Sequence, residues 1–145
     1  MKVRFKKLHQ DAVVPTKAHP QDAGFDLTCT TVVTDYENNI LSCGTGIAVE
    51  IPDGFVGLLF PRSSVYKKNL VLSNCVGVID SNYRGEVTMK FKMENLPGYY
   101  AANVYMAGDR IGQLIIMPYP EVEFEEAGDL SETDRGEGGY GSTGE

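Results

Sequence analysis

Apolar and polar residues along the chain are arranged in short runs of strand length. Within each run apolar side chains alternate with polar ones or stand next to one another. No window shows the apolar stripe of period 3.6 that is typical of an amphipathic helix. The runs are Val3–Leu8, Ile47–Ile51, Val56–Phe60, Leu70–Leu72, Val87–Met93, Val104–Met106 and Ile111–Met117. With turn-forming residues between them, they predict an all-β sandwich or barrel.

One short helical turn is predicted within this β pattern. It covers Ser63–Asn69, where Ser63 or Ser64 would cap the first turn and leave backbone N–H groups free.

The segment Val76–Met89 predicts a β-hairpin whose loop carries Asp80 and Tyr83. Asp80 ends an apolar run, so its carboxylate would either hold the turn through an Asx hydrogen bond or deprotonate a water as a general base. Tyr83 would be either a packed edge aromatic or a flat platform for a sugar ring. The residues of this segment leave both pairs of alternatives open.

The composition is that of one globular domain. Of 145 residues, 42% are apolar and 23% are charged, and the net charge is −7. This acidic balance argues against a nucleic acid polymer or an anionic membrane as the main partner. No apolar run approaches the roughly 18 residues of a spanning helix, and none follows the basic start as in a signal peptide. We therefore expect a soluble protein of the cytoplasm or another intracellular compartment.

The cysteines predict neither disulfides nor a zinc site. Cys29, Cys43 and Cys75 share no C-x-x-C spacing, and no two of these residues and His9 or His19 lie at a metal-ligand spacing. We expect reduced thiols that act as small buried hydrophobic residues.

The end of the chain differs in composition from the rest. Residues 121–145 contain nine acidic residues and a single base, Arg135, and six of the sixteen glycines lie between Gly128 and Gly144. Such a segment cannot form a core, which predicts a β domain over residues 1–127 and a flexible glycine-rich arm over 128–145. Residues 121–134 are expected to be a solvated tail, whereas 135–144 hold a cation, an aromatic ring and two hydroxyls suited to a phosphorylated ligand.

Arginines are candidates for an anion-binding pocket because guanidinium binds phosphate in a bidentate manner. Four of the five stand beside glycine, serine or acidic residues of predicted turns: Arg62, Arg84, Arg110 and Arg135. The alternative is pairing with a sequence neighbour, of Arg84 with Glu86 or Asp80 and of Arg110 with Asp109.

Five segments, in order along nearly the whole chain, resemble the five motifs of the trimeric deoxyuridine triphosphatases (dUTPases). They are Asp22–Leu27, Pro61–Ser64, Gly77–Val87, Gly108–Leu114 and Arg135–Gly144. The resemblance implies a jelly-roll (β-clip) barrel and a homotrimer with shared active sites. It implies an enzyme, a dUTP diphosphatase, that hydrolyses dUTP to dUMP and pyrophosphate with Mg²⁺.

The resemblance also implies a role for each matching residue at the nucleoside. Asp80 would be the general base that activates water for attack on the α-phosphorus. Tyr83 would pack against the deoxyribose and exclude a 2′-hydroxyl. Uracil would be read by Asn74 and by the backbone around three further residues, Val78, Ile79 and Thr88.

Further matching residues would bind the triphosphate and its metal. The phosphate-binding positions are Arg62, Ser63, Ser64 and Gln113. Asp26 would hold waters of a Mg²⁺ that arrives with the substrate.

The arm would close over the site, which excludes water and aligns the substrate. Arg135 would bind the terminal phosphate, and Tyr140 would stack over uracil. Three small residues, Gly141, Ser142 and Thr143, would bind phosphate oxygens.

Two residues depart from the family pattern. Tyr140 stands where phenylalanine is usual, and Asn82 stands where a second acid is frequent.

Two other functions remain as alternatives. A dCTP deaminase-related enzyme shares the fold and an Arg-Ser-Ser segment, but such chains are longer and lack this glycine-rich tail. A noncatalytic nucleotide sensor on the same fold is the alternative from another class.

Overall fold

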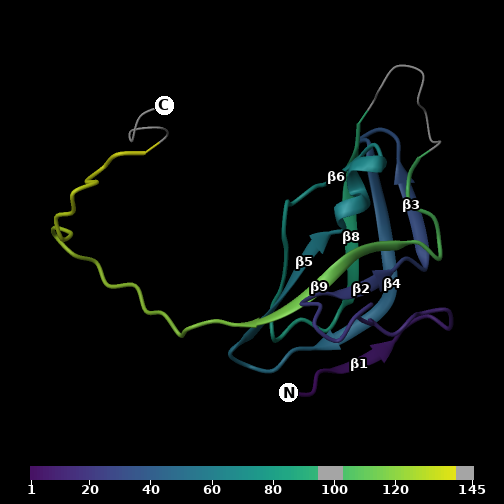
Figure 1. The fold of residues 1–145 in the computed structure, drawn as a ribbon, viewed down its shortest axis with the longest axis horizontal. Helices are drawn as coiled ribbons and strands as arrows, with labels where there is room; N and C mark the ends of the chain where they lie inside the picture. Colours follow the sequence, from purple (N-terminus) through teal and green to yellow (C-terminus); the bar gives the residue numbers. More distant parts are fainter. Residues whose placement is uncertain (95–102, 140–145) are drawn as a thin grey trace.

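The computed structural model describes residues 1–94 and 103–139, which form nine β-strands and one short 3₁₀ helix (Figure 1). The elements are β1 (Arg4–Lys7), β2 (Phe25–Thr28), β3 (Thr31–Asp35), β4 (Ile40–Glu50), β5 (Phe55–Pro61), η1 (Ser63–Lys67), β6 (Leu70–Leu72), β7 (Gly77–Ile79), β8 (Glu86–Met93) and β9 (Arg110–Pro118). The all-β prediction is confirmed, and the jelly-roll fold agrees with the two antiparallel sheets described next.

The strands form two antiparallel sheets. In the first, β1, β4, β8 and β6 lie in that order, with β3 also paired to β4. In the second the order is β2, β9, β5, β7. Both sheets contribute to one hydrophobic core, as shown by the buried Met89 and Phe91 of β8 and the buried Leu59 and Leu114 of β5 and β9. Alternating burial along β8 places every second side chain in this core.

Two strands and half of a third were not predicted. β2 and β3 are short, and β3 is only half-buried on its inner face. The first half of β4 contains Gly44 and Gly46, which favour turns in a sequence. Here Gly44 is fully enclosed, since a Cβ would lie 2.5 Å from Thr31 Oγ1 and 2.6 Å from Glu86 Oε1. Gly46 has a φ of 64° and sits where the β4–β8 register shifts, a bulge that favours glycine.

The predicted strand Val104–Met106 is wrong, because this segment has no strand pairing and leads from a bend into the turn at Ala107 and Gly108. Its apolar character has another cause. Tyr105 is 2% exposed and packs on Phe91 with ring centroids 5.2 Å apart. Asp109 accepts a hydrogen bond from the Met106 N–H, which closes the turn.

The predicted hairpin over Val76–Met89 is also wrong. β7 pairs with β5, whereas β8 pairs with β4 and β6, so the two strands belong to different sheets. The loop between them, which carries Asp80 and Tyr83, therefore crosses from one sheet to the other.

The predicted helical turn is present but shorter and differently capped. It is a 3₁₀ helix whose N-cap is Arg62, and no side chain caps it, so the expected cap by Ser63 or Ser64 is wrong. The turn is closed instead by the Val65 N–H, which donates to the Arg62 carbonyl at 2.9 Å.

All three cysteines are free thiols, as predicted. Cys29 and Cys43 are buried, but Cys75 is exposed, which corrects the expectation for that residue. The hydrogen bond between the Cys29 and Cys43 thiols, together with burial, raises the pKa of Cys43, so this thiol stays protonated.

After β9 the chain leaves the sheets. Figure 1 shows the residues that follow Pro118 leading away from the β domain as an extended segment. Pro118 and Pro120 lack an N–H, which ends the β9 ladder at this point. In the part of the chain that the structure describes, no helix is long and apolar enough to cross a membrane.

Candidate active site

Three adjacent strands bring together several of the predicted phosphate-binding residues. In register, Asp26 of β2 lies opposite Gln113 of β9, and Gln113 lies opposite Phe60 of β5. β5 ends one residue after Phe60, so Arg62 leaves the sheet beside Gln113. The Gln113 side chain amide donates to the Pro61 carbonyl at 3.4 Å, which orients it towards this strand end.

Asp26 lies between two guanidinium groups. Its Oδ2 accepts a hydrogen bond from Nη1 of Arg110 at 2.8 Å, and its Oδ1 lies 3.3 Å from Nε of Arg62. The Asp26 side chain is 20% exposed, so the two ion pairs are partly shielded from water. Two cations beside one carboxylate leave a net positive charge, which favours an anion here.

The two serines that follow Arg62 begin the 3₁₀ helix at the edge of this cluster. Ser63 is exposed and Ser64 is half-buried. The structure therefore gathers Asp26, Arg62, Gln113 and both serines at one end of β5.

The predicted nucleoside-binding residues line a second site, a cleft of about 260 Å³ between β7 and β8. Its lining includes Asn74, Val78, Ile79, Asp80, Tyr83 and Thr88. Within the described residues β7 pairs with β5 alone, so its other edge has main-chain N–H and C=O groups that no strand takes up. Such an edge can read the donor and acceptor pattern of a planar base.

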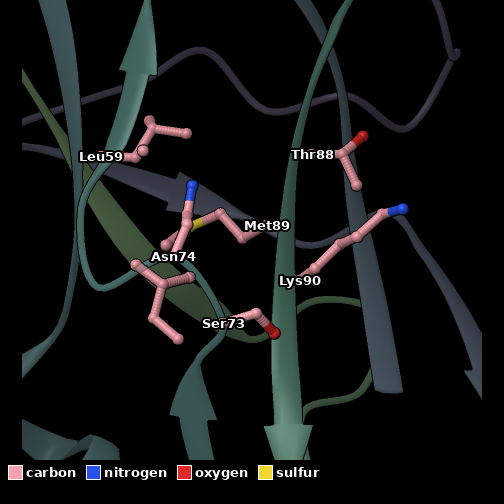
Figure 2. Close-up of a pocket in the computed structure, with 8 residues that line it drawn as sticks. Leu59, Ser73, Asn74, Thr88, Met89 and Lys90 are labelled. Atoms are coloured by element: carbon pink, nitrogen blue, oxygen red, sulfur yellow. The ribbon is translucent and has the colours of Figure 1, made fainter. Parts of the chain in front are cut away.

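A neighbouring pocket extends this cleft towards the core. The residues of β8 that line this pocket point to both faces of the strand. Figure 2 shows Met89 on the same side of β8 as Leu59 and Asn74. Thr88 and Lys90 project from the opposite side, in line with the alternating burial of the strand. Thr88 therefore meets the cleft through its main chain, whereas Asn74 offers its side chain amide.

The bend that presents Asn74 has an unusual backbone. β6 ends at Leu72 and β7 begins at Gly77, and between them Cys75 has a φ of 58°, in the left-handed region. A non-glycine residue in this conformation is strained and is frequently found at functional sites. The hydrogen bond from the Cys75 N–H to the Leu72 carbonyl holds the bend at 3.1 Å. Nothing in the sequence pattern indicated this residue.

Asp80 is exposed at the rim of the cleft, and its turn is closed by main-chain atoms. The Tyr83 N–H donates to the Asp80 carbonyl at 3.1 Å. Within the described residues the Asp80 carboxylate has neither a hydrogen bond nor an ion pair. The Asx-turn alternative is therefore not what the structure shows.

The Tyr83 ring is held from two directions. Its hydroxyl donates to the Glu86 carbonyl at 3.0 Å. Gly85 lies against the ring, because a Cβ at Gly85 would be 2.3 Å from the Tyr83 hydroxyl oxygen. Tyr83 as a whole is 43% exposed, so part of the residue is accessible from solvent.

Neither alternative pairing of an arginine with a sequence neighbour is found among the described residues. Arg110 pairs with Asp26, not with Asp109. Arg84 lies 3.8 Å from Glu50 and donates to the carbonyls of the Asp80–Tyr83 turn. The sequence named Arg110 as a candidate for an anion pocket but did not indicate its partner Asp26, which lies 84 residues away.

The two sites lie apart within one chain. Ile79, next to Asp80, is opposite Gly57, and Arg62 comes five residues after Gly57 along β5. At about 3.3 Å per residue, these five residues span roughly 17 Å. One copy of the chain therefore separates the Asp80 cleft from the Asp26 cluster.

Of the predicted arm residues only Arg135 is described. Its Nε donates to the Gly138 carbonyl at 2.8 Å, within the exposed segment that leads away from the sheets. The other predicted contacts, Tyr140, Gly141, Ser142 and Thr143, lie outside the described residues.

The donor set fits a metal ion that is carried by its substrate. Within residues 1–94 and 103–139 no group of three or more His, Cys, Asp or Glu side chains is placed to hold a metal ion. Asp26 offers single carboxylate oxygens beside an anion-attracting cluster. Mg²⁺ characteristically keeps its waters and is bound through one or two carboxylates plus phosphate oxygens, which matches this arrangement.

Comparison with known proteins agrees with this geometry. The dUTPase family model matches residues 10–144 of the chain. The deoxyuridine 5′-triphosphate nucleotidohydrolase of Rhodococcus erythropolis is 42% identical over 145 residues, which covers 99% of this chain and 87% of that protein. The corresponding protein of a Hydrogenobaculum species is 40% identical, with 99% of each chain covered. The chain belongs to the dUTPase family.

Solved dUTPase structures share the fold. The dUTPase of Staphylococcus bacteriophage 80alpha, as a G164S mutant with dUpNHpp, superposes with a TM-score of 0.83 at 28% identity, covering 99% of this chain and 98% of that one. A D95N mutant dUTPase of the S. aureus phage phi11, which coordinates a structural Mg(II) ion, gives a TM-score of 0.74 at 27% identity, with 90% and 99% covered. The family resemblance drawn from the five motifs is thus confirmed.

Proposed function

We propose that this dUTPase family member hydrolyses dUTP to dUMP and pyrophosphate. The observation that carries the proposal is the cleft between β7 and β8, where an unpaired strand edge and Asn74 lie beside the free carboxylate of Asp80. The relatives named above as deoxyuridine 5′-triphosphate nucleotidohydrolases, and the phage enzyme solved with dUpNHpp, support the choice of substrate.

Asp80 acts as the general base. Its carboxylate takes a proton from a water whose oxygen then bonds to the α-phosphorus, and the bond from that phosphorus to the bridging oxygen breaks to release pyrophosphate. An exposed carboxylate with no partner among the described residues is able to do this without first losing an ion pair.

The cleft selects the nucleoside. Asn74 and the main chain at Val78, Ile79 and Thr88 pair with the uracil edge. Cytosine exchanges a donor for an acceptor and would leave buried groups unpaired, a penalty that supports strong discrimination. The Tyr83 ring, fixed by its bond to Glu86, packs on the deoxyribose where a 2′-hydroxyl would clash.

The Asp26 cluster binds the triphosphate. Arg62 and Gln113, with Ser63 and Ser64 at the start of η1, supply donors to phosphate oxygens. Bound Mg²⁺ would neutralise phosphate charge during the reaction, and Asp26 would accept hydrogen bonds from its waters. Asp26 thereby orients both the arginines and the metal-bound substrate.

A complete site requires more than one copy of the chain. The strand positions that lead to Asp80 and Arg62 lie roughly 17 Å apart, so the proposed base and the proposed phosphate donors of one chain stand at opposite ends of β5. We therefore propose a homotrimer in which the Asp80 cleft of one subunit faces the Asp26 cluster of another. We propose that the enzyme acts in the cytoplasm or in another intracellular compartment.

The glycine-rich arm, residues 128–145, closes the site. Arg135 binds the terminal phosphate and Tyr140 stacks over uracil, while Gly141, Ser142 and Thr143 contact phosphate oxygens. The support for this proposal is the family match, which extends to residue 144.

Pyrophosphate release from dUTP, dCTP, dTTP and UTP, each offered separately with Mg²⁺, tests the proposal. Selective turnover of dUTP is expected. Turnover of dCTP with release of ammonia would instead indicate the deaminase-related reaction, and tight binding of dUTP without turnover would indicate a nucleotide sensor.

A further inference from the structure

Lys68 joins the end of η1 to the turn that precedes β9. Its Nζ donates a hydrogen bond to the Val104 carbonyl at 3.1 Å and lies 3.8 Å from Oδ2 of Asp109. Lys68 is the C-cap of η1, and Asp109 immediately precedes Arg110, the first residue of β9. One side chain therefore connects two segments that lie 36 residues apart in sequence.

The Lys68 side chain is held in one position by its surroundings. Its Nζ lies over the Tyr105 ring, 5.2 Å from the ring centroid. Tyr105 is buried and packs on Phe91 of β8, so the ring below the ammonium group is part of the core. With a ring face, a carbonyl and a carboxylate as partners, this ammonium group has far less freedom than that of a solvated lysine.

The preceding residue, Lys67, provides a contrast. Lys67 is exposed, and its Nζ lies 5.7 Å from the ring centroid of Tyr66, which is itself 79% exposed. Within the described residues the Lys67 ammonium group forms no ion pair, whereas that of Lys68 pairs with Asp109. Two adjacent lysines therefore carry the same charge, and only Lys68 connects η1 to the turn before β9.

The Asp109 carboxylate also shapes the turn from which Arg110 enters β9. Its Oδ2 accepts a hydrogen bond from the Met106 N–H at 2.9 Å. The Asp109 carbonyl accepts a hydrogen bond from the Cys29 N–H at 2.8 Å, and Cys29 directly follows β2, the strand that carries Asp26. The carboxylate that pairs with the lysine thus belongs to the turn that aligns Arg110 with Asp26.

The residues of the proposed phosphate site form two groups, one on each of the segments that Lys68 connects. The first group stands at the start of η1 and the second on β9: Arg62, Ser63 and Ser64, then Arg110 and Gln113. A polyphosphate that contacts both groups binds more tightly when their spacing is fixed beforehand, because ordering side chains on binding costs affinity. Asp26 fixes this spacing from within the sheet, and Lys68 fixes it from the other end of η1.

We propose that Lys68 is a positioning residue for binding of the triphosphate. It holds η1 against the turn before β9 through Asp109, Val104 and Tyr105, and it does not itself touch phosphate. The inference rests on the proposed function for the location of the phosphate site, and it adds a residue that lies outside that site.

Lys68→Met keeps an apolar side chain over the Tyr105 ring and removes the charge, and Lys67→Met is the matched control because it removes the same charge from the next residue. Binding of Mg²⁺·tripolyphosphate to the intact protein, measured by calorimetry, should weaken about fivefold or more in Lys68→Met. It should be unchanged in Lys67→Met and largely retained in Lys68→Arg. Equal tripolyphosphate binding by Lys68→Met and Lys67→Met would overturn the proposal.

Deoxyuridine, which has no phosphate, separates positioning of the phosphate site from a general loss of structure. It should bind to the native protein and to Lys68→Met with the same dissociation constant, because the nucleoside cleft between β7 and β8 contains no contact of Lys68. An equal loss of deoxyuridine and tripolyphosphate binding in Lys68→Met would show a merely structural role and overturn the proposal.

Asp109→Asn distinguishes positioning from direct contact with phosphate. The change removes the charge that pairs with Lys68, while the amide oxygen can still accept the hydrogen bond from the Met106 N–H. Positioning predicts weaker tripolyphosphate binding in Asp109→Asn, and little further loss when this change is combined with Lys68→Met. If Lys68 bound phosphate directly, loss of the neighbouring negative charge would instead strengthen binding, and that result would overturn the proposal.

Turnover supplies a separate readout. In hydrolysis of dUTP, Lys68→Met should raise KM about fivefold and leave kcat nearly unchanged, because Asp80 and its cleft are untouched. Calorimetry with tripolyphosphate needs no turnover, so a native protein that is inactive on dUTP would overturn the proposed function without altering the binding test of Lys68.

Discussion

Asp26 of β2 and Arg110 of β9 form an ion pair at 2.8 Å across two strands that are adjacent in the sheet but 84 residues apart in sequence. Arg62 approaches the same carboxylate at 3.3 Å from the end of β5. Asp26 thus fixes the spacing of two guanidinium groups at the proposed phosphate site.

Removing that carboxylate charge should impair substrate binding more than stability. Asp26→Asn releases both arginines and removes the acceptor for metal-bound water, so we expect the KM for Mg²⁺·dUTP to rise about tenfold. The free energy of unfolding in urea should fall by on the order of 1 kcal/mol, because the ion pairs are partly exposed. Asp53→Asn, at an exposed turn residue, is the control. An unchanged KM would remove Asp26 from the site.

The Tyr83 ring should lose its position when Gly85 gains a side chain. In Gly85→Ala the new Cβ would lie 2.3 Å from the Tyr83 hydroxyl oxygen and 2.5 Å from Cζ, so the ring must move. We expect the preference for dUTP over UTP, measured as the ratio of kcat/KM values, to fall about tenfold.

Gly128→Ala, where a Cβ would meet no atom within 4 Å, should leave that ratio unchanged. The same ratio in both variants would argue that Tyr83 does not discriminate the sugar.

A buried tyrosine hydroxyl is expected to lower the free energy of unfolding at alkaline pH. The Tyr105 hydroxyl is buried without a partner among the described residues, and burial raises its pKa above the ordinary value of about 10. Above pH 10 the unfolded chain ionises this group while the folded one keeps its proton, so stability falls as pH rises. Below pH 10 the hydroxyl is protonated in both the folded and the unfolded chain, so it causes no change of stability with pH.

Tyr105→Phe should therefore remove part of the loss of stability between pH 9 and pH 11. At pH 7 the change should be neutral or stabilising by up to about 1 kcal/mol, since an unsatisfied polar group is removed. Urea unfolding at the three pH values measures both effects. A variant less stable by several kcal/mol at pH 7 would show that the hydroxyl has a partner.

Deletion of residues 135–145 should leave the fold intact and reduce turnover. The segment 119–134 is retained, and the deleted residues contribute no strand or core side chain among those described. Loss of closure and alignment should lower kcat about hundredfold or more. Circular dichroism and sedimentation check the fold and assembly, and full activity of the truncated protein would refute the role of the arm.

The sequence predicted the strands with strong apolar patterns. β8 buries every second side chain, no residue of β5 is exposed, and β9 buries Ile111, Gly112 and Leu114. β4 was only half predicted because Gly44 and Gly46 favour turns in general, yet here they fill places where a side chain has no room or the backbone needs a positive φ. The pairing of strands depends on contacts between residues that are far apart in sequence. A local hydrophobic pattern contains no information about these contacts.

For the same reason the individual site residues were predicted, but their arrangement in space was not. The motif residues were found by resemblance, and the structure places them in two groups, around Asp26 and around Asp80. The pairing of Arg110 with Asp26 was missed, and the loop of Asp80 was expected within one hairpin, because pairing over 84 residues and a crossing between sheets leave no local signature.

Hydrolysis of dUTP in ¹⁸O-labelled water, by the native protein and by Asp80→Asn, tests the central claim most directly. Asp80 is exposed and has no partner among the described residues, so the variant should fold and bind dUTP normally. We predict that the label enters dUMP rather than pyrophosphate and that Asp80→Asn lowers kcat by about 10²–10⁴. Label in pyrophosphate, or full turnover by the variant, would contradict attack at the α-phosphorus with Asp80 as the base.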